Sequence, residues 1–149
     1  MPIFVDADAC PVKDEVLRVA ERHGWPVHMV SNSFMRLPAH PLINRVVVED
    51  GPDVADNWIA ERAAKGDIVI TSDIPLAHHC VKAGAIVIRA DGKVLDEGSI
   101  GMALAMRNLM QDLRESGSMQ TYNASFTKAE RSKFLQALET AIQAIKRAG

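Results

Sequence analysis

The stretch that decides the fold is Ile3-Phe4-Val5-Asp6-Ala7-Asp8-Ala9-Cys10-Pro11. Its three leading apolar residues predict a short buried strand, and two aspartates follow where that strand would end. Pro11 predicts the start of a helix, because proline is tolerated in a first turn, and Gly24 predicts its end. The stretch therefore predicts a strand, an acidic loop and a helix in immediate succession.

The same unit of strand and helix recurs along the chain. Further strands are expected at residues 26–30, 45–48, 68–71 and 85–88. Further helices are expected from Asp53 to about Lys65, over 75–82, over about 99–115 with Ile100 and Met106 on its apolar face, and from the capping box Thr127-x-x-Glu130 onward. The pair Asp91-Gly92 predicts a tight turn.

The strands are continuous apolar runs, which is typical of a parallel sheet covered by helices on both faces. We therefore predict the α/β class, with residues 1–149 as a single domain. A peripheral place for the C-terminal helix, residues 126–149, is left open.

The amino-acid composition excludes several classes of protein. Apolar residues make up 48% and charged residues 24% of the 149, as in ordinary globular domains. No apolar run reaches the 18 residues of a membrane span, and no positive stretch precedes the first apolar run as in a signal peptide. We therefore expect a cytoplasmic location and no membrane partner, with the oligomeric state open.

Cys10 and Cys80 share no zinc motif and are predicted to be reduced and structural. His78 and His79 are predicted to be surface or packing residues. The net charge of −2 does not indicate a nucleic-acid-binding protein, although residues 118–149 carry a net charge of +3.

Aspartates follow three of the predicted strands. They are Asp6 and Asp8 after the first, Asp53 and Asp56 at the head of the helix after the third, and Asp73 after the fourth. The carboxyl ends of parallel strands meet at one edge of a sheet, so these acids are expected to gather there. Gathered carboxylates repel unless a cation lies among them, and Mg²⁺ or Mn²⁺ prefers such oxygen ligands. The pattern predicts metal-assisted phosphodiester hydrolysis.

A simpler interpretation of some of these acids is helix capping, which Asp53 and Asp73 would each satisfy alone. Asp6 ends a strand several residues before Pro11, and Asp56 lies inside a first turn, so capping requires neither of them. Asp67 precedes its strand and is excluded, because it is expected at the opposite edge.

Other residues of this edge are candidates for contact with a phosphate or a base. They are Asn32, Ser33 and Arg36 in the loop after the second strand, Lys13 near the first helix start, and Ser72. The alternative for each is an ordinary solvated or turn-forming side chain.

Three motifs in this order resemble the bacterial YaiI/YqxD family, also called UPF0178. They are Val5-Asp6-Ala7-Asp8-Ala9-Cys10-Pro11, Gly51-Pro52-Asp53-Val54-Ala55-Asp56 and Thr71-Ser72-Asp73-Ile74-Pro75-Leu76-Ala77. That family is grouped with PIN-like domains, whose active members are metal-dependent ribonucleases. The resemblance implies a PIN-like fold, RNA as substrate, and Asp6, Asp56 and Asp73 at the acidic positions. PIN-like enzymes often have glutamate where this chain has Asp56.

On this hypothesis Asp6, Asp56 and Asp73 bind Mg²⁺ or Mn²⁺, while Asp8 or Asp53 positions a water or a second ion. Two rival functions remain open. One is a phosphatase of the haloacid dehalogenase type, with Asp6 as the nucleophile. The other is a domain that binds metal, RNA or a protein partner without catalysis.

Overall fold

The computed structural model describes residues 2–7, 10–32, 40–49, 54–115 and 127–148. These ranges form a six-stranded sheet in the order β3-β2-β1-β4-β5-β6. The strands are β1 (Ile3–Asp6), β2 (Val27–Ser31), β3 (Ile43–Val47), β4 (Ile68–Ile70), β5 (Ile86–Ile88) and β6 (Val94–Leu95). The helices are α1 (Lys13–His23), α2 (Val54–Arg62), α3 (Ile74–Lys82), α4 (Glu97–Glu115) and α5 (Lys128–Ala148). All neighbouring strands pair in parallel except β5 and β6, which are antiparallel.

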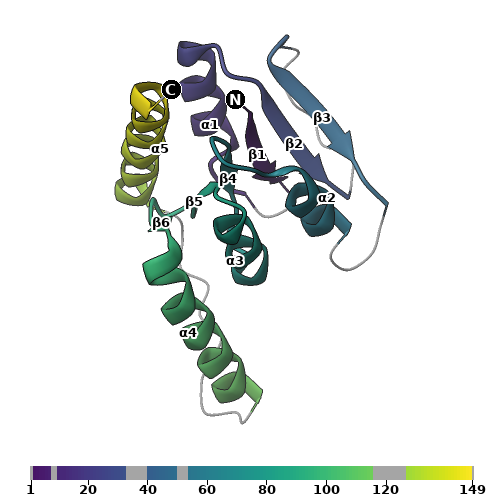
Figure 1. The fold of residues 1–149 in the computed structure, drawn as a ribbon, viewed down its shortest axis with the longest axis vertical. Helices are drawn as coiled ribbons and strands as arrows, with labels where there is room; N and C mark the ends of the chain where they lie inside the picture. The colour runs from purple at the N-terminus through teal and green to yellow at the C-terminus, as the bar shows by residue number, and fades with distance from the viewer. Residues whose placement is uncertain (1, 8–9, 33–39, 50–53, 116–126, 149) are drawn as a thin grey trace.

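Helices cover the sheet on both faces (Figure 1). Successive side chains of a strand point to opposite faces, so Ile3 and Val5 join the core under α1 and α5, whereas Phe4 joins the core under α2, α3 and the start of α4. The central strands β1 and β4 are buried on both sides, which explains why their sequences are continuous apolar runs. The predicted α/β class with a largely parallel sheet is confirmed.

Two strands differ from the prediction by more than one residue at either end. Strand β3 begins at Ile43 rather than at Arg45, because its main chain pairs with β2 from the Val27–Ile43 position onward. Strand β6 was not predicted, because a strand of two residues is too short to show an alternation of apolar and polar side chains. It forms because the turn after β5 brings Val94 opposite Ile88, with the Arg89 N–H donating to the Lys93 carbonyl at 2.9 Å.

The described part of the C-terminal helix packs one face against the core. Phe134, Leu138 and Ile142 of α5 are fully buried against α1 and the sheet. The capping box is confirmed: Glu130 N–H donates to Thr127 Oγ1 at 3.1 Å, and Thr127 N–H donates to Glu130 Oε1 at 3.3 Å. The helix therefore contributes directly to the packing that holds the sheet.

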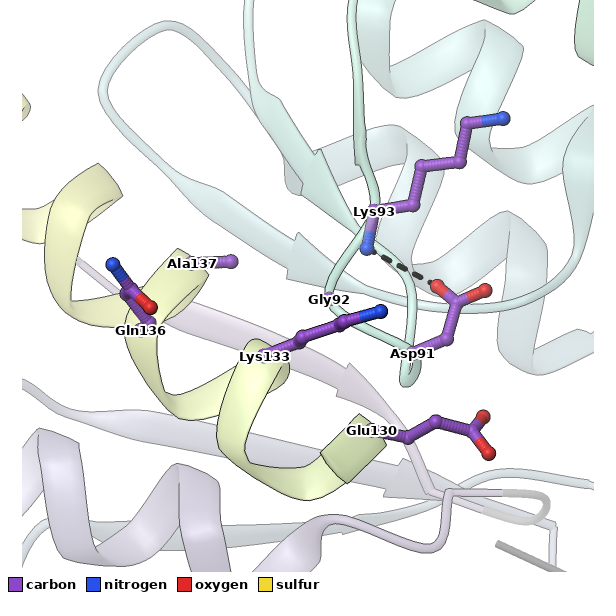
Figure 2. Close-up of a pocket in the computed structure, with 7 residues that line it drawn as sticks. All are labelled: Asp91, Gly92, Lys93, Glu130, Lys133, Gln136 and Ala137. Carbon is purple, nitrogen blue, oxygen red and sulfur yellow. Dashed lines mark hydrogen bonds between the residues drawn. The ribbon is translucent and has the colours of Figure 1, made fainter. Parts of the chain in front are cut away.

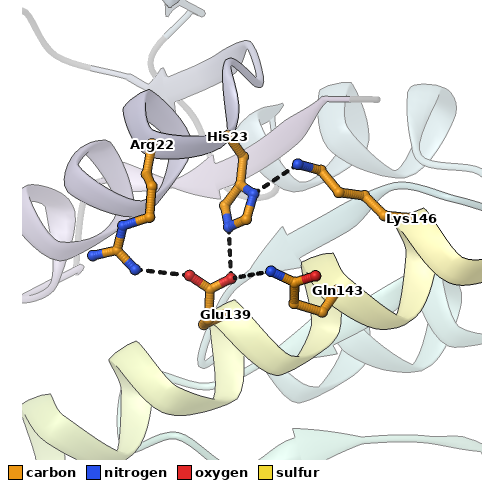
Figure 3. Close-up of polar contacts among 5 residues, drawn as sticks. All are labelled: Arg22, His23, Glu139, Gln143 and Lys146. Carbon is orange, nitrogen blue, oxygen red and sulfur yellow. Dashed lines mark hydrogen bonds and ion pairs between the residues drawn. The ribbon is translucent and has the colours of Figure 1, made fainter.

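A polar cluster joins the end of α1 to α5 (Figure 3). His23 Nε2 lies 2.6 Å from Glu139 Oε2, and Lys146 Nζ donates to His23 Nδ1 at 2.7 Å. Because Lys146 can only donate, the proton of a neutral His23 belongs on Nε2. Burial raises the pKa of Glu139, but hydrogen bonds from His23, Gln143 and Arg22 outweigh it and hold that pKa below its ordinary value.

Helix α4 extends away from the sheet after its first turns (Figure 1). Ile100 is buried against the core, whereas Met102 and Met106 are 76% and 49% exposed. Of the residues predicted for the apolar face, Ile100 thus packs against the core and Met106 does not, because the helix has left the body by Met106. Within the described ranges, no helix has the length and apolar character needed to cross a membrane.

Candidate functional site

The order of the strands creates a crevice between β1 and β4. The chain moves from β1 outward through β2 to β3 and then resumes at β4 on the other side of β1. Loops from adjacent strands diverge at such a reversal, and ligands of open α/β sheets bind outside the carboxyl ends of the strands there. Val5 pairs with Ile70 in register, so Asp6 and Thr71 come next at this crevice.

A buried hydroxyl links the two strand ends. Thr71, only 4% exposed, donates from Oγ1 to Asp6 Oδ2 at 3.0 Å and accepts from the Asp73 N–H at 3.0 Å. Asp73 caps α3, since its Oδ1 accepts from the Leu76 N–H at 2.9 Å. Capping uses one oxygen of Asp73, and Oδ2 has no hydrogen-bond partner among the described residues. The cap interpretation of Asp73 is correct and leaves half of the carboxylate available.

Two hollows adjoin this link, and Asp73 lines both. The first, about 300 Å³, is lined by Asp6, Cys10, Thr71, Ser72 and Asp73, among others. The second, about 560 Å³, lies between α2 and α3 and includes Asp56, Asn57, Asp73, Pro75, Leu76 and His79. The structure thus brings Asp6 and Asp73 to one hollow, and Asp56 to the neighbouring one.

The described residues do not by themselves complete a metal cage. Within the ranges given above, no three Asp, Glu, His or Cys side chains form a group that could hold a metal ion. Asp8 and Asp53, the other two predicted ligands, lie outside the described residues.

Of the residues predicted to contact substrate, some lie near the first hollow and others lie outside the described residues. Ser72 is exposed and lines the first hollow, and Lys13 Nζ donates to the carbonyl of Cys10 at 2.9 Å, beside that hollow. Asn32 follows β2 at the same edge and is half-buried. Ser33 and Arg36 lie outside the described residues. Asp67 precedes β4, as expected, and its Oδ2 accepts from the Ala64 N–H at 3.0 Å at the opposite edge.

Sequence reasoning missed Thr71 and the position of His79. Alternation from Val5 and Ile70 places Asp6 and Thr71 on the same face of adjacent strands, but this inference needs the β1–β4 pairing. His79 is exposed, as predicted for a surface residue, yet it faces the hollow that Asp56 and Asp73 share. Its distance of four residues from Pro75 puts both on one side of α3.

Both cysteines are free and buried. Burial, and then the nearby charge of Asp56, raises the pKa of Cys80 to about 11. Burial likewise raises the pKa of Cys10 above its ordinary value. Burial thus favours the protonated form of both thiols, and Cys10 forms part of the wall of the first hollow.

A further hollow, about 560 Å³, lies between the β5–β6 turn and α5 (Figure 2). Lys133 extends from α5 toward the turn, and the Lys93 N–H donates to Asp91 Oδ1 at 3.1 Å. A Cβ on Gly92, whose φ is +89°, would lie 2.7 Å from the carbonyl carbon of Lys133, so the turn approaches α5 as only glycine allows. None of the predicted site residues lines this hollow.

Comparison with known proteins identifies the family. The sequence model of the YaiI/YqxD family, which is described as uncharacterized, matches residues 4–144. The UPF0178 protein of Nitrobacter winogradskyi is 60% identical over 146 residues, covering 98% of this chain and 93% of its own. Those of Parvibaculum lavamentivorans and Rhodopseudomonas palustris (strain HaA2) are each 59% identical over 145 residues, covering 97% of this chain and 95% and 88% of their own. No solved structure matches the chain. The protein therefore belongs to the YaiI/YqxD (UPF0178) family.

Proposed function

We propose that this protein is a divalent-metal-dependent phosphodiesterase that acts on RNA. The observation that carries the proposal is the meeting of Asp6 and Asp73 in one hollow, where the strand order of the sheet reverses. The two carboxylates come from segments 67 residues apart in the sequence, and the Thr71 hydroxyl joins the carboxylate of Asp6 to the main chain of Asp73.

Two carboxylates are enough for the kind of site proposed. Mg²⁺ keeps several of its waters and is commonly bound by one or two carboxylates together with the phosphates of the substrate. Asp6 and Asp73 would bind the ion directly, whereas Asp56, which lines the neighbouring hollow, would act through a water or a second ion. Asp8 and Asp53 stay predicted ligands of the same edge.

Such an ion, when bound, supplies a water of lowered pKa and stabilises the negative charge of the phosphate. The residues of the chain contribute by orienting the carboxylates that would bind the ion. Thr71 donates to Asp6 Oδ2, which orients that carboxylate, and Leu76 N–H orients the carboxylate of Asp73. Asp6 and Asp73 are the only acidic side chains among the described residues that line the first hollow.

The choice of RNA rests on the resemblance to PIN-like domains and on the candidate contacts around the hollow. Lys13 is held beside Cys10 by its hydrogen bond, close enough to the hollow to meet a flanking phosphate. Asn32 and Ser72 add neutral polar groups at the same edge.

The first test is a calorimetric titration of Mn²⁺ into the wild type and into Asp6→Asn/Asp73→Asn. Asparagine caps a helix about as well as aspartate, so the variant is expected to fold. We expect binding by the wild type, no binding by the variant, and Mn²⁺-dependent cleavage of single-stranded RNA by the wild type alone. Asp67→Asn, which changes an acid of the opposite edge, is the matched control.

If neither protein binds Mn²⁺ and the double variant melts at a higher temperature, the carboxylates merely repel each other and the proposal fails. If the wild type binds Mn²⁺ but cleaves neither RNA nor DNA, the site is a metal site without the proposed activity.

A further inference from the structure

We propose that the hollow between α2 and α3 binds one unstacked base of a single-stranded RNA, next to the acidic edge. This inference rests on the proposed function and gives the site a specific subsite. The starting observation is that Asp56 and Asp73, two of the proposed metal-site acids, line this hollow together with side chains that have no part in metal binding.

The walls of the hollow combine apolar side chains with the carboxylates of Asp56, Glu61 and Asp73. Ala60 of α2 and Pro75 and Leu76 of α3 provide apolar surface, on which the face of a base can pack. The volume of about 560 Å³ lies within the usual range for small-molecule sites. The hollow is therefore large enough for one base with its ribose.

Both helices also contribute polar side chains to the lining of the hollow. Asn57 lies at the start of α2 and presents an amide, which offers a donor and an acceptor side by side, the pattern that pairs with adenine. His79 lines the same hollow from α3 and presents an aromatic ring, on which a splayed base can stack. Both side chains are exposed, and among the described residues neither has a hydrogen bond or ion pair to give up.

The position of Asp73 sets the direction of the RNA. Because Asp73 lines both hollows, a base between α2 and α3 would place its own phosphate toward Asp73 and the hollow of Asp6. An unstacked base in this hollow thus holds the phosphodiester at the acidic edge. The same arrangement explains why single-stranded RNA, rather than a duplex, is the expected ligand.

The test measures binding without catalysis, in EDTA, by fluorescence anisotropy. The probes are a labelled RNA octamer of adenylates and an octamer with the same ribose-phosphate backbone and no bases. Base–aromatic stacking predicts that the wild type binds the adenylate octamer about tenfold more tightly. Asn57→Ala/His79→Ala is expected to lose most of that ratio while keeping its affinity for the base-free backbone.

Two controls match the variant. His78→Ala removes the neighbouring histidine of the same helix, which does not line the hollow, and Asn108→Ala removes an exposed amide from α4. Both should keep the tenfold ratio. If Asn57→Ala/His79→Ala keeps it as well, or if the wild type binds the two octamers equally, the inference is overturned.

The outcome is separable from that of the proposed function. Suppose that Asn57→Ala/His79→Ala loses the affinity ratio between the two octamers, while the wild type neither binds Mn²⁺ nor cleaves RNA. That result would support the base pocket and contradict the proposed phosphodiesterase activity. Conversely, Mn²⁺-dependent cleavage that is unaffected by Asn57→Ala/His79→Ala, with an unchanged ratio, would leave the activity standing without this pocket.

Discussion

Two regions of the molecule join distant segments through polar side chains, and they do so in opposite ways. Between α1 and α5, Glu139 meets Arg22 at 2.8 Å and His23 at 2.6 Å, so a carboxylate meets nitrogen donors of a neighbouring helix (Figure 3). At the carboxyl edge, Asp6 and Asp73 are linked through the neutral hydroxyl of Thr71. No Lys, Arg or His of the described residues forms an ion pair with Asp73.

The difference teaches how to separate stability from function in this fold. A carboxylate that meets cations in the protein serves the packing of the helices on which it lies. Carboxylates gathered at one edge repel each other, and a cationic ligand bound between them would relieve that repulsion. The contact between α1 and α5 should therefore govern stability, and the carboxyl edge should govern ligand binding.

The largest expected effect is on the helix side. Phe134→Ala empties a fully buried position under α5 and should lower the free energy of unfolding by about 3–5 kcal/mol. Urea unfolding followed by circular dichroism measures it. Met102→Ala, at a position 76% exposed, is the control and should change stability by about 0.5 kcal/mol or less. Equal losses in the two variants would contradict the assignment of α5 to the core.

An intermediate effect is expected at the carboxyl edge. Thr71→Val keeps the shape of the side chain but removes the donor to Asp6 and the acceptor of the Asp73 N–H, at a cost of about 1–3 kcal/mol. It should also weaken Mn²⁺ binding, since the Asp6 carboxylate loses its orientation. Thermal melting measures the loss of stability and calorimetry measures the loss of Mn²⁺ affinity, with Thr140→Val at an exposed position of α5 as the matched control. Unaltered Mn²⁺ affinity would show that Thr71 serves stability alone.

The smallest effect concerns pH. Since the folded pKa of Glu139 lies below its ordinary value of 4.5, its stabilising contribution is present above pH 4.5 and is lost as the pH falls through the lower folded value. Glu139→Gln should therefore be less stable than the wild type at neutral pH, by about 1 kcal/mol or less, and the difference should shrink in acid. Urea midpoints at pH 7 and below pH 4 test this. A difference that grows in acid would show that the sign is wrong.

Much of the candidate site could be predicted because it depends on local signals. Asp6 and Asp73 each follow an apolar run, and a strand end is visible in the sequence wherever such a run stops. The capping box of α5 is a four-residue pattern, and it formed with the hydrogen bonds that the pattern predicts. Local hydrogen bonding and periodicity are properties of neighbouring residues, so neighbouring residues reveal them.

Other parts of the site depend on which strands pair. Thr71 became part of the site only because β1 lies beside β4, and His79 only because α3 packs near α2. Strand β6 forms only through its pairing with β5. The spacing of residues in the sequence cannot predict these contacts between strands and helices, because the contacting segments lie far apart in the chain.

The sequence by itself thus determined the class of fold, the places of Asp6 and Asp73 just after apolar strands, and the helix boundaries to within a few residues, since apolar periodicity and capping act over one or two turns. The tertiary structure decided which acids share a hollow, which hydroxyl links them and which side chains line the hollow between α2 and α3. The physical reason is that strand order and helix packing minimise the exposed apolar surface of the whole chain, and that quantity belongs to no single segment.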